Sequence, residues 1–272
     1  MFTIWHARVA FACAMVLAIA LSVTASAAGY QLPAPLQGGP EGPIAVMPGG
    51  SVAQPPAVTG MPAATGCPAA PYGARFYAPG SSKTAALTFD DGPGKSTAAI
   101  LAILARYRVP ATFFNIGVNM PPRPSLVRAE VKGGYAMGNH TWNHPDMAAL
   151  SAAQQAAELD QMSAEQRSIT GTVPCAFRPP YGEYDSTTLR LAQQRRMGVW
   201  LWSVDTQDWM AEGSGSSYWV HRIIRLAEQE GGALRHPIVL MHNQPIGNPA
   251  TVSALPAIIQ FFRSHGYRFA AL

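Results

Sequence analysis

From Lys83 onward, short apolar runs alternate along the chain with longer amphipathic segments. The apolar runs have the length of buried strands, and the longer segments repeat their apolar residues at the three- and four-residue spacing of helices. The predicted strands are Ala85–Phe89, Ala111–Ile116, Tyr135–Gly138, Cys175–Arg178, Val199–Val204, Pro237–Met241 and Tyr267–Ala270. The predicted helices are Ser96–Tyr107, Ser125–Lys132, Ser151–Ser168, Ser186–Arg196, Ser217–Glu230 and Thr251–His265. Because strands and helices alternate, the pattern predicts an α/β fold with a parallel sheet.

Two architectures fit this alternation, a doubly wound sheet and a small barrel. Both place ligand sites at the carboxyl ends of the parallel strands. The residues that follow each predicted strand are therefore the first place to look for chemistry.

The N-terminal segment has a different pattern. His6 and Arg8 form a short polar start, the fifteen residues Val9–Val23 are almost wholly apolar, and small residues follow at Ala25–Ala27. A retained membrane anchor is the alternative, but this run is shorter than the roughly 20 residues that span a bilayer. We therefore expect residues 1–27 to be a cleaved signal peptide, and the mature protein to be secreted or periplasmic without a stable membrane anchor.

Residues 28–66 form a second distinct region. Eight Pro and eight Gly lie between Gly29 and Gly66, with almost no charge and no helical or strand periodicity. This composition is typical of a linker, or of a tail without a function of its own. The predicted organisation is a signal peptide over 1–27, a linker over 28–66 and one catalytic domain over 67–272.

Composition and charge narrow the function classes. With 48% hydrophobic and 12% charged residues the chain can bury a sizeable core, which excludes a disordered polymer. The net charge of +4 is dispersed, so we expect no nucleic-acid partner. Once Cys13 leaves with the signal peptide, Cys67 and Cys175 remain in an oxidising compartment, where a disulfide is expected and two free thiols are the alternative.

Polar and ionisable residues gather where the predicted strands end. They are Asp90, Asp91, His140, His144, Arg178, Asp205, Asp208 and His242. In a parallel α/β fold these positions share one rim, so side chains from five separate segments can meet in one pocket.

A metal centre explains several of these residues together. His140 and His144 are spaced to reach one ion, and with one aspartate they form a donor set that suits zinc and leaves positions open for substrate. Surface histidines and a solvated Asp-Asp-Gly-Pro turn are the alternatives. Two adjacent carboxylates, Asp90 and Asp91, raise the free energy of each other's ionisation, and a cation relieves that repulsion.

Five segments resemble, in order, the motifs of NodB-like polysaccharide deacetylases, which form carbohydrate esterase family four. The segments are Thr88–Pro93 (TFDDGP), His140–His144 (HTWNH), Arg178–Gly182 (RPPYG), Asp205–Trp209 (DTQDW) and Leu240–His242 (LMH). The likeness runs from about Ala85 to Leu272. It implies a distorted, incomplete (β/α) barrel of about seven parallel strands.

The resemblance also implies the metal and the base. Asp91, His140 and His144 would hold a divalent metal, commonly zinc, and the same donors also accept cobalt or nickel. Asp90 would take a proton from water that the metal acidifies. Arg178 would pair with Asp90 and keep it ionised.

Three further roles follow from the same resemblance. The backbone N–H of Tyr181 would stabilise the developing oxyanion. His242 would protonate the leaving amine, and it would need a carboxylate partner to stay cationic. Asp208 is the expected partner because it directly precedes Trp209, and Asp205 is the reserve.

Trp209 and Leu240 would wall the pocket for the acetyl methyl group, with ordinary core packing as their alternative. The expected function is a secreted, metal-dependent enzyme that removes N-acetyl groups from an amino-sugar polymer such as peptidoglycan or a chitin-like glycan. The alternatives are an O-acetyl esterase on xylan or another glycan, and a non-catalytic glycan-binding module. An acetylated polysaccharide is the expected partner, and the protein is expected to be a monomer.

Overall fold

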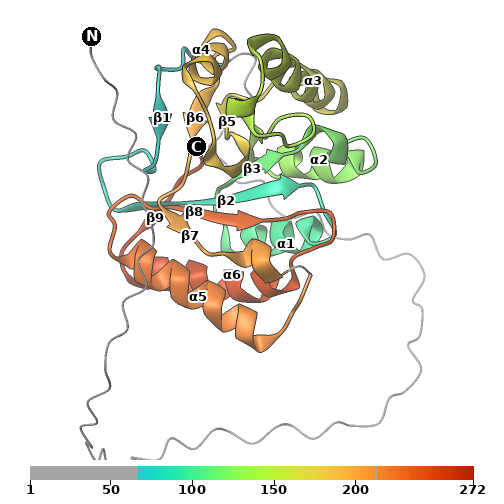
Figure 1. The fold of residues 1–272 in the computed structure, drawn as a ribbon. Helices are drawn as coiled ribbons and strands as arrows, with labels where there is room; N and C mark the ends of the chain where they lie inside the picture. The colour runs from blue at the N-terminus through green and yellow to red at the C-terminus, as the bar shows by residue number, and fades with distance from the viewer. Residues whose placement is uncertain (1–66, 212) are drawn as a thin grey trace, which may run out of the picture. The chain divides into compact units, whose positions relative to one another are not determined.

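A computed structural model describes residues 67–211 and 213–272, which form a nine-stranded sheet with helices around it (Figure 1). The strands are β1 (Ala74–Arg75), β2 (Thr84–Gly92), β3 (Ala111–Asn115), β4 (Ala136–Asn139), β5 (Ala176–Phe177), β6 (Gly198–Trp200), β7 (Val204–Asp205), β8 (Ile238–His242) and β9 (Arg268–Phe269). Their order is β1-β6-β5-β4-β3-β2-β8-β7, with β9 beside β2. Each of these strand pairings is parallel, as the alternating pattern predicts.

The predicted strand Val199–Val204 is wrong as a single element. β6 pairs with β5 and β1, whereas β7 pairs with β8 at the other end of the strand order. The chain leaves the sheet between them because the carbonyl oxygens of Trp200 and Leu201 accept hydrogen bonds from the Arg178 side chain, at 3.0 and 2.9 Å. Four Cα steps from Trp200 to Val204 span at most about 15 Å. The two ends of the sheet are therefore close together, and the sheet curves into an incomplete barrel.

All six predicted helices are confirmed to within a few residues. They are α1 (Thr97–Tyr107), α2 (Pro124–Lys132), α3 (Ala152–Thr170), α4 (Ser186–Gln194), α5 (Ser217–Gly232) and α6 (Pro249–Ser264). Local sequence signals set several ends. Ser151 and Gln154 form a capping box at the start of α3, and Gly171 ends that helix in the left-handed conformation. The helices lie outside the curved sheet, with α5 packed against α6 (Figure 1).

β2 is the central strand and carries the first of the polar motifs. It lies between β3 and β8, and eight of its nine residues are buried, which explains its nearly continuous apolar run. Phe89 stacks on Phe113 of β3 with ring centroids 5.2 Å apart, and Tyr135 packs edge-on against Phe113. This packed core holds the carboxyl end of β2 in a fixed position.

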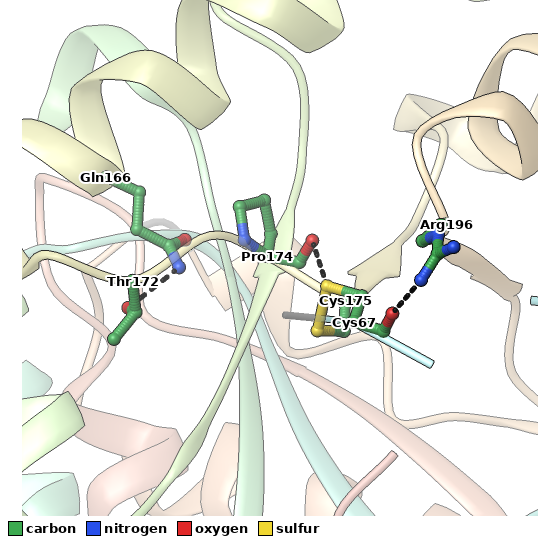
Figure 2. Close-up of a disulfide and its surroundings, with 6 residues drawn as sticks. All are labelled: Cys67, Gln166, Thr172, Pro174, Cys175 and Arg196. Carbon is green, nitrogen blue, oxygen red and sulfur yellow. Dashed lines mark hydrogen bonds between the residues drawn. A yellow bond between two sulfur atoms is a disulfide. The ribbon is translucent and has the colours of Figure 1, made fainter. Parts of the chain in front are cut away.

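The expected disulfide is confirmed: Cys67 and Cys175 are bonded, 108 residues apart in the sequence (Figure 2). The guanidinium of Arg196 also donates a hydrogen bond of 3.2 Å to the carbonyl of Cys67. Together they fasten the first described residues beside the start of β5. The predicted signal peptide (1–27) and linker (28–66) lie outside the described residues. Among residues 67–211 and 213–272, no helix is both long and apolar enough to cross a bilayer.

Candidate active site

The polar residues predicted to share one rim do meet there. A pocket of about 650 Å³ opens at the carboxyl ends of the strands. Its lining consists of Asp90, Asp91, His140, His144, Tyr181, Trp202, Asp205, Trp209, Leu240, His242 and Gln244. Arg178 and Asp208 lie just behind this lining, each fully buried and bonded to a lining residue.

The backbone around the pocket is strained. Seven non-glycine residues in the described part of the chain have positive φ, and five of them belong to the five motifs: Asp91, Thr141, His144, Tyr181 and Gln207. Side chains with a Cβ adopt this conformation rarely, so the surrounding structure must enforce it. The motif loops therefore adopt backbone conformations of higher energy, and these conformations set the direction of their side chains.

Asp90 and Arg178 form a buried ion pair at one wall of the pocket. Nη1 of Arg178 lies 2.8 Å from Oδ1 of Asp90 and also donates to the hydroxyl of Thr88 at 2.8 Å. The other two guanidinium nitrogens donate to the carbonyl oxygens of Trp200, the last residue of β6, and Leu201. Burial lowers the pKa of Arg178, and the neighbouring charge of Asp90 opposes that change. Because a guanidinium stays charged, the pair places a fixed positive charge beside the carboxylate of Asp90.

Asp91, His140 and His144 form a separate cluster beside this pair. Nε2 of His140 is 3.4 Å from Oδ1 of Asp91, and Nε2 of His144 is 3.3 Å from the same oxygen. One donor atom from each residue lies within 4.8 Å of the other two. The cluster is the only group of at least three histidine, cysteine or acidic side chains within the described ranges that is spaced to hold one metal ion.

The donor atoms of this cluster fit a divalent cation. Nδ1 of His140 lies 2.7 Å from the carbonyl oxygen of Arg178, and since a carbonyl only accepts, Nδ1 carries the proton. In the neutral imidazole that metals bind, Nε2 then presents a lone pair toward Oδ1 of Asp91, a buried oxygen that receives no hydrogen bond from any described residue. Two facing lone pairs repel each other unless a cation lies between them. Burial also lowers the pKa of His144, which favours the neutral imidazole that metals bind.

His242 and Asp208 form a second ion pair, and His242 is the register partner of Asp90 on the neighbouring strand β8. Nδ1 of His242 is 2.7 Å from Oδ1 of Asp208, while Oδ2 of Asp208 accepts from the backbone N–H of His242 and from the hydroxyl of Thr251. Burial disfavours the charged imidazole, but the attraction of Asp208, with smaller help from Asp91 and Asp90, raises the pKa of His242 to about 9. The reserve residue Asp205 is not bonded to His242; it accepts a bond from the backbone of Gln207 instead.

The rest of the lining is mostly aromatic or apolar. Tyr181 packs edge-on against His144 with ring centroids 4.7 Å apart, and Trp209 is about half exposed while Leu240 is buried. Two lining residues, Trp202 and Gln244, were not predicted from the sequence. Neither belongs to a motif, although Trp202 lies three residues before Asp205 and Gln244 two after His242, so their closeness to motif residues was the available signal.

Comparison with known proteins decides the family. The model of the polysaccharide deacetylase family matches residues 77–200. A peptidoglycan-N-acetylglucosamine deacetylase of Bacillus cereus is 32% identical over 203 residues, which cover 74% of this chain and 71% of the relative. The chain belongs to the polysaccharide deacetylase family. The residues that the family model matches include Asp91, His140 and His144 of the cluster.

Solved structures agree with this assignment. The crystal structure of the Bc1960 peptidoglycan N-acetylglucosamine deacetylase shares 32% identity and a TM-score of 0.68, covering 74% of this chain and 91% of that one. The chitin deacetylase of Colletotrichum lindemuthianum shares 27% identity and a TM-score of 0.67, covering 74% and 90%. The incomplete (β/α) barrel expected from the sequence is therefore confirmed.

Proposed function

We propose that this chain is an exported, metal-dependent deacetylase that removes N-acetyl groups from an amino-sugar glycan. The observation that carries the proposal is the arrangement in one pocket of three units: the Asp90–Arg178 pair, the Asp91–His140–His144 cluster and the His242–Asp208 pair. A base, a metal site and an acid are the parts that amide hydrolysis needs.

Asp91, His140 and His144 would hold the metal. A divalent cation held there supplies Lewis-acid chemistry, polarising a carbonyl oxygen and making a water molecule more acidic. Nitrogen and carboxylate donors suit zinc, and cobalt or nickel would also bind. The carbonyl of Arg178 fixes the orientation of the His140 ring by accepting its Nδ1 proton.

Asp90 would act as the general base. Its carboxylate is 2% exposed and paired with Arg178, and it would take a proton from the attacking water. The backbone N–H of Tyr181 would donate to the oxyanion that forms on the acetyl carbonyl.

His242 would act as the general acid. With a pKa of about 9 it is cationic at neutral pH and can give its Nε2 proton to the leaving nitrogen. An amide nitrogen leaves poorly without a proton, whereas an alcohol oxygen leaves more readily. The strong support that Asp208 gives to cationic His242 therefore favours N-acetyl over O-acetyl substrates.

Substrate class and location complete the proposal. Trp209 and Leu240 would enclose the acetyl methyl group, and Tyr181 would bound the open side of the pocket. One relative is named a peptidoglycan-N-acetylglucosamine deacetylase and another a chitin deacetylase, so an acetylated envelope or chitin-like glycan is the proposed substrate. A signal peptide over 1–27, a linker over 28–66 and a monomeric catalytic domain over 67–272 suit an enzyme that acts outside the cytoplasm.

Acetate release tests the proposal. The zinc-loaded chain is incubated with N-acetylglucosamine oligomers and, in parallel, with O-acetylated xylan. We expect faster release from the oligomers, loss of release after chelation, and recovery on adding zinc or cobalt. Release from xylan alone would make the chain an O-acetyl esterase. No release from either glycan by zinc-loaded protein would leave a glycan-binding module, and full release by protein verified as metal-free would refute the metal site.

A further inference from the structure

A fully buried polar layer lies beneath the turn that carries Asp90 and Asp91. Glu130 of α2 is 0% exposed, and its Oε2 accepts a hydrogen bond of 2.6 Å from Nδ2 of Asn115, the last residue of β3, which is also 0% exposed. Val127, the other buried residue of α2, is apolar. Burying a carboxyl group and an amide in an apolar core costs free energy of folding. Their presence here therefore suggests a functional role.

The backbone of Asn115 contacts His140 of the metal-site cluster and Gly92, the residue after Asp91. Its carbonyl accepts the N–H of His140 at 3.1 Å. It also pairs in register with Gly92, next to the irregularity in β2 between Asp90 and Gly92 that contains Asp91. The position of Asn115 is therefore linked to the backbone of both Asp91 and His140.

Gly92 shows how tightly the layer closes under the turn. A Cβ at this glycine would lie 2.5 Å from Oδ1 of Asn115 and 2.3 Å from Nδ2 of Asn243, which is too close for any side chain. Asn243, also fully buried, donates its backbone N–H to the carbonyl of Asp90 at 2.9 Å and its side-chain N–H to Thr97 at 2.9 Å. The two side-chain amides thus pack directly against Gly92, and Glu130 fixes the amide of Asn115 through its hydrogen bond.

We propose that Glu130, acting through Asn115, is a positioning residue that keeps the donor atoms of Asp91 and His140 at metal-binding distance. The inference rests on the proposed metal-dependent function of the same site. It assigns Glu130 no contact with substrate or metal. Outer residues that orient metal ligands in this way typically change metal affinity about 10- to 100-fold when they are lost.

The protonation state of Glu130 suggests the right conservative variant. Burial raises the pKa of this carboxyl to about 8, and the bond from Asn115 opposes the rise only in part. The group is therefore mostly a neutral acid at pH 7. Glutamine matches a neutral acid in size, keeps the acceptor for Asn115 and also keeps a donor.

Zinc and cobalt affinities of folded protein, measured by isothermal titration at pH 7, test the inference. We expect Glu130→Leu and Asn115→Ala each to bind the metals at least about tenfold more weakly than wild type, and Glu130→Gln to stay within about twofold. The matched control is Gln166→Leu. Gln166 is likewise fully buried on a helix with an unpaired oxygen, but it lies in the surroundings of the disulfide (Figure 2) and does not line the pocket. We expect Gln166→Leu to keep wild-type metal affinity, although its thermal stability should fall by about as much as that of Glu130→Leu.

The outcomes separate this inference from the proposed function. If wild type binds no metal, the metal-dependent function fails and this inference fails with it. If wild type binds metal and folded Glu130→Leu binds it equally well, only the inference is overturned. If Glu130→Leu does not fold, Asn115→Ala decides by the same criterion. Weakened binding in Gln166→Leu as well would show a general effect of core damage and would also overturn the inference.

Discussion

Replacing Asp208 with Asn tests how the pocket keeps its acid charged. The side chains have nearly the same shape, so Oδ1 of the new residue can still accept the Nδ1 proton of His242. Its Nδ2, however, replaces the oxygen that accepts from the backbone N–H of His242, so that one hydrogen bond is lost. The change removes the negative charge 2.7 Å from the imidazole. The loss of this charge should lower the pKa of His242, and the zinc content of the variant checks that the lost backbone hydrogen bond leaves the metal site intact.

The size of the effect follows from the electrostatics. Burial lowers the pKa of His242, yet carboxylate attraction, mostly from Asp208, brings it to about 9 from the ordinary 6.5. That difference corresponds to roughly 3 kcal/mol in favour of the cation. Bound metal offsets the charge of Asp91 but not that of Asp208, which lies behind His242 and is fully buried. Losing Asp208 should lower the pKa of His242 by about one to two pH units.

The assay is the pH dependence of kcat/KM for acetate release, which reports the pKa values of the free enzyme. Wild type should lose activity as the pH rises through about 9, because His242 then gives up its proton. Asp208→Asn should lose activity at correspondingly lower pH with unchanged zinc content. Asp205→Asn is the matched control. This pocket carboxylate bonds the backbone of Gln207 and acts on His242 only through its charge, so its alkaline limb should move less than that of Asp208→Asn. An alkaline limb that Asp208→Asn leaves unmoved would refute the reasoning.

Three further predictions concern the metal, the disulfide and the buried acid. His140→Ala should abolish tight zinc binding, measured by metal content after dialysis, whereas exposed His221→Ala should bind one zinc as wild type does. Replacing Cys67 and Cys175 with Ser should lower the free energy of unfolding by about 2 to 4 kcal/mol, and reducing agent should then no longer change the thermal midpoint; a midpoint equal to that of oxidised wild type would contradict this. Because the folded-state pKa of Glu130 is about 8 against 4.5 for the free side chain, wild type should lose stability as pH rises from about 4.5 to 8, by up to about 5 kcal/mol. Glu130→Gln has no carboxyl to ionise, so its thermal midpoint should rise relative to that of wild type between pH 5 and pH 9. Parallel plots of midpoint against pH for the two proteins would show that Glu130 titrates normally.

Periodicity predicted the helices and the parallel sheet, but not where the barrel nearly closes. The run Val199–Val204 looks like one buried strand because every residue except Ser203 is apolar or aromatic. The break arises because carbonyls within it bond to Arg178, a contact between segments more than twenty residues apart. β1 was missed for a simpler reason: two residues, Ala74 and Arg75, are too short to show a period.

The sequence also predicted which ionisable residues meet, since motif residues at strand ends need only the fold to bring them together. It could not predict the support beneath them. Glu130 lies in a helix with charged neighbours at Arg128 and Lys132, and such a glutamate normally faces solvent. Only the packing of α2 against the sheet shows that it points inward to Asn115.

The central claim is that Asp90 and a metal together hydrolyse N-acetyl groups in this pocket. The most direct test measures acetate and free amine released from an N-acetylglucosamine oligomer by zinc-loaded wild type and by zinc-loaded Asp90→Asn. Wild type should release the two products in equal amounts, and Asp90→Asn, at equal zinc content, should lose at least about 100-fold in rate. A wild-type rate in Asp90→Asn, or acetate without matching free amine, would contradict the account.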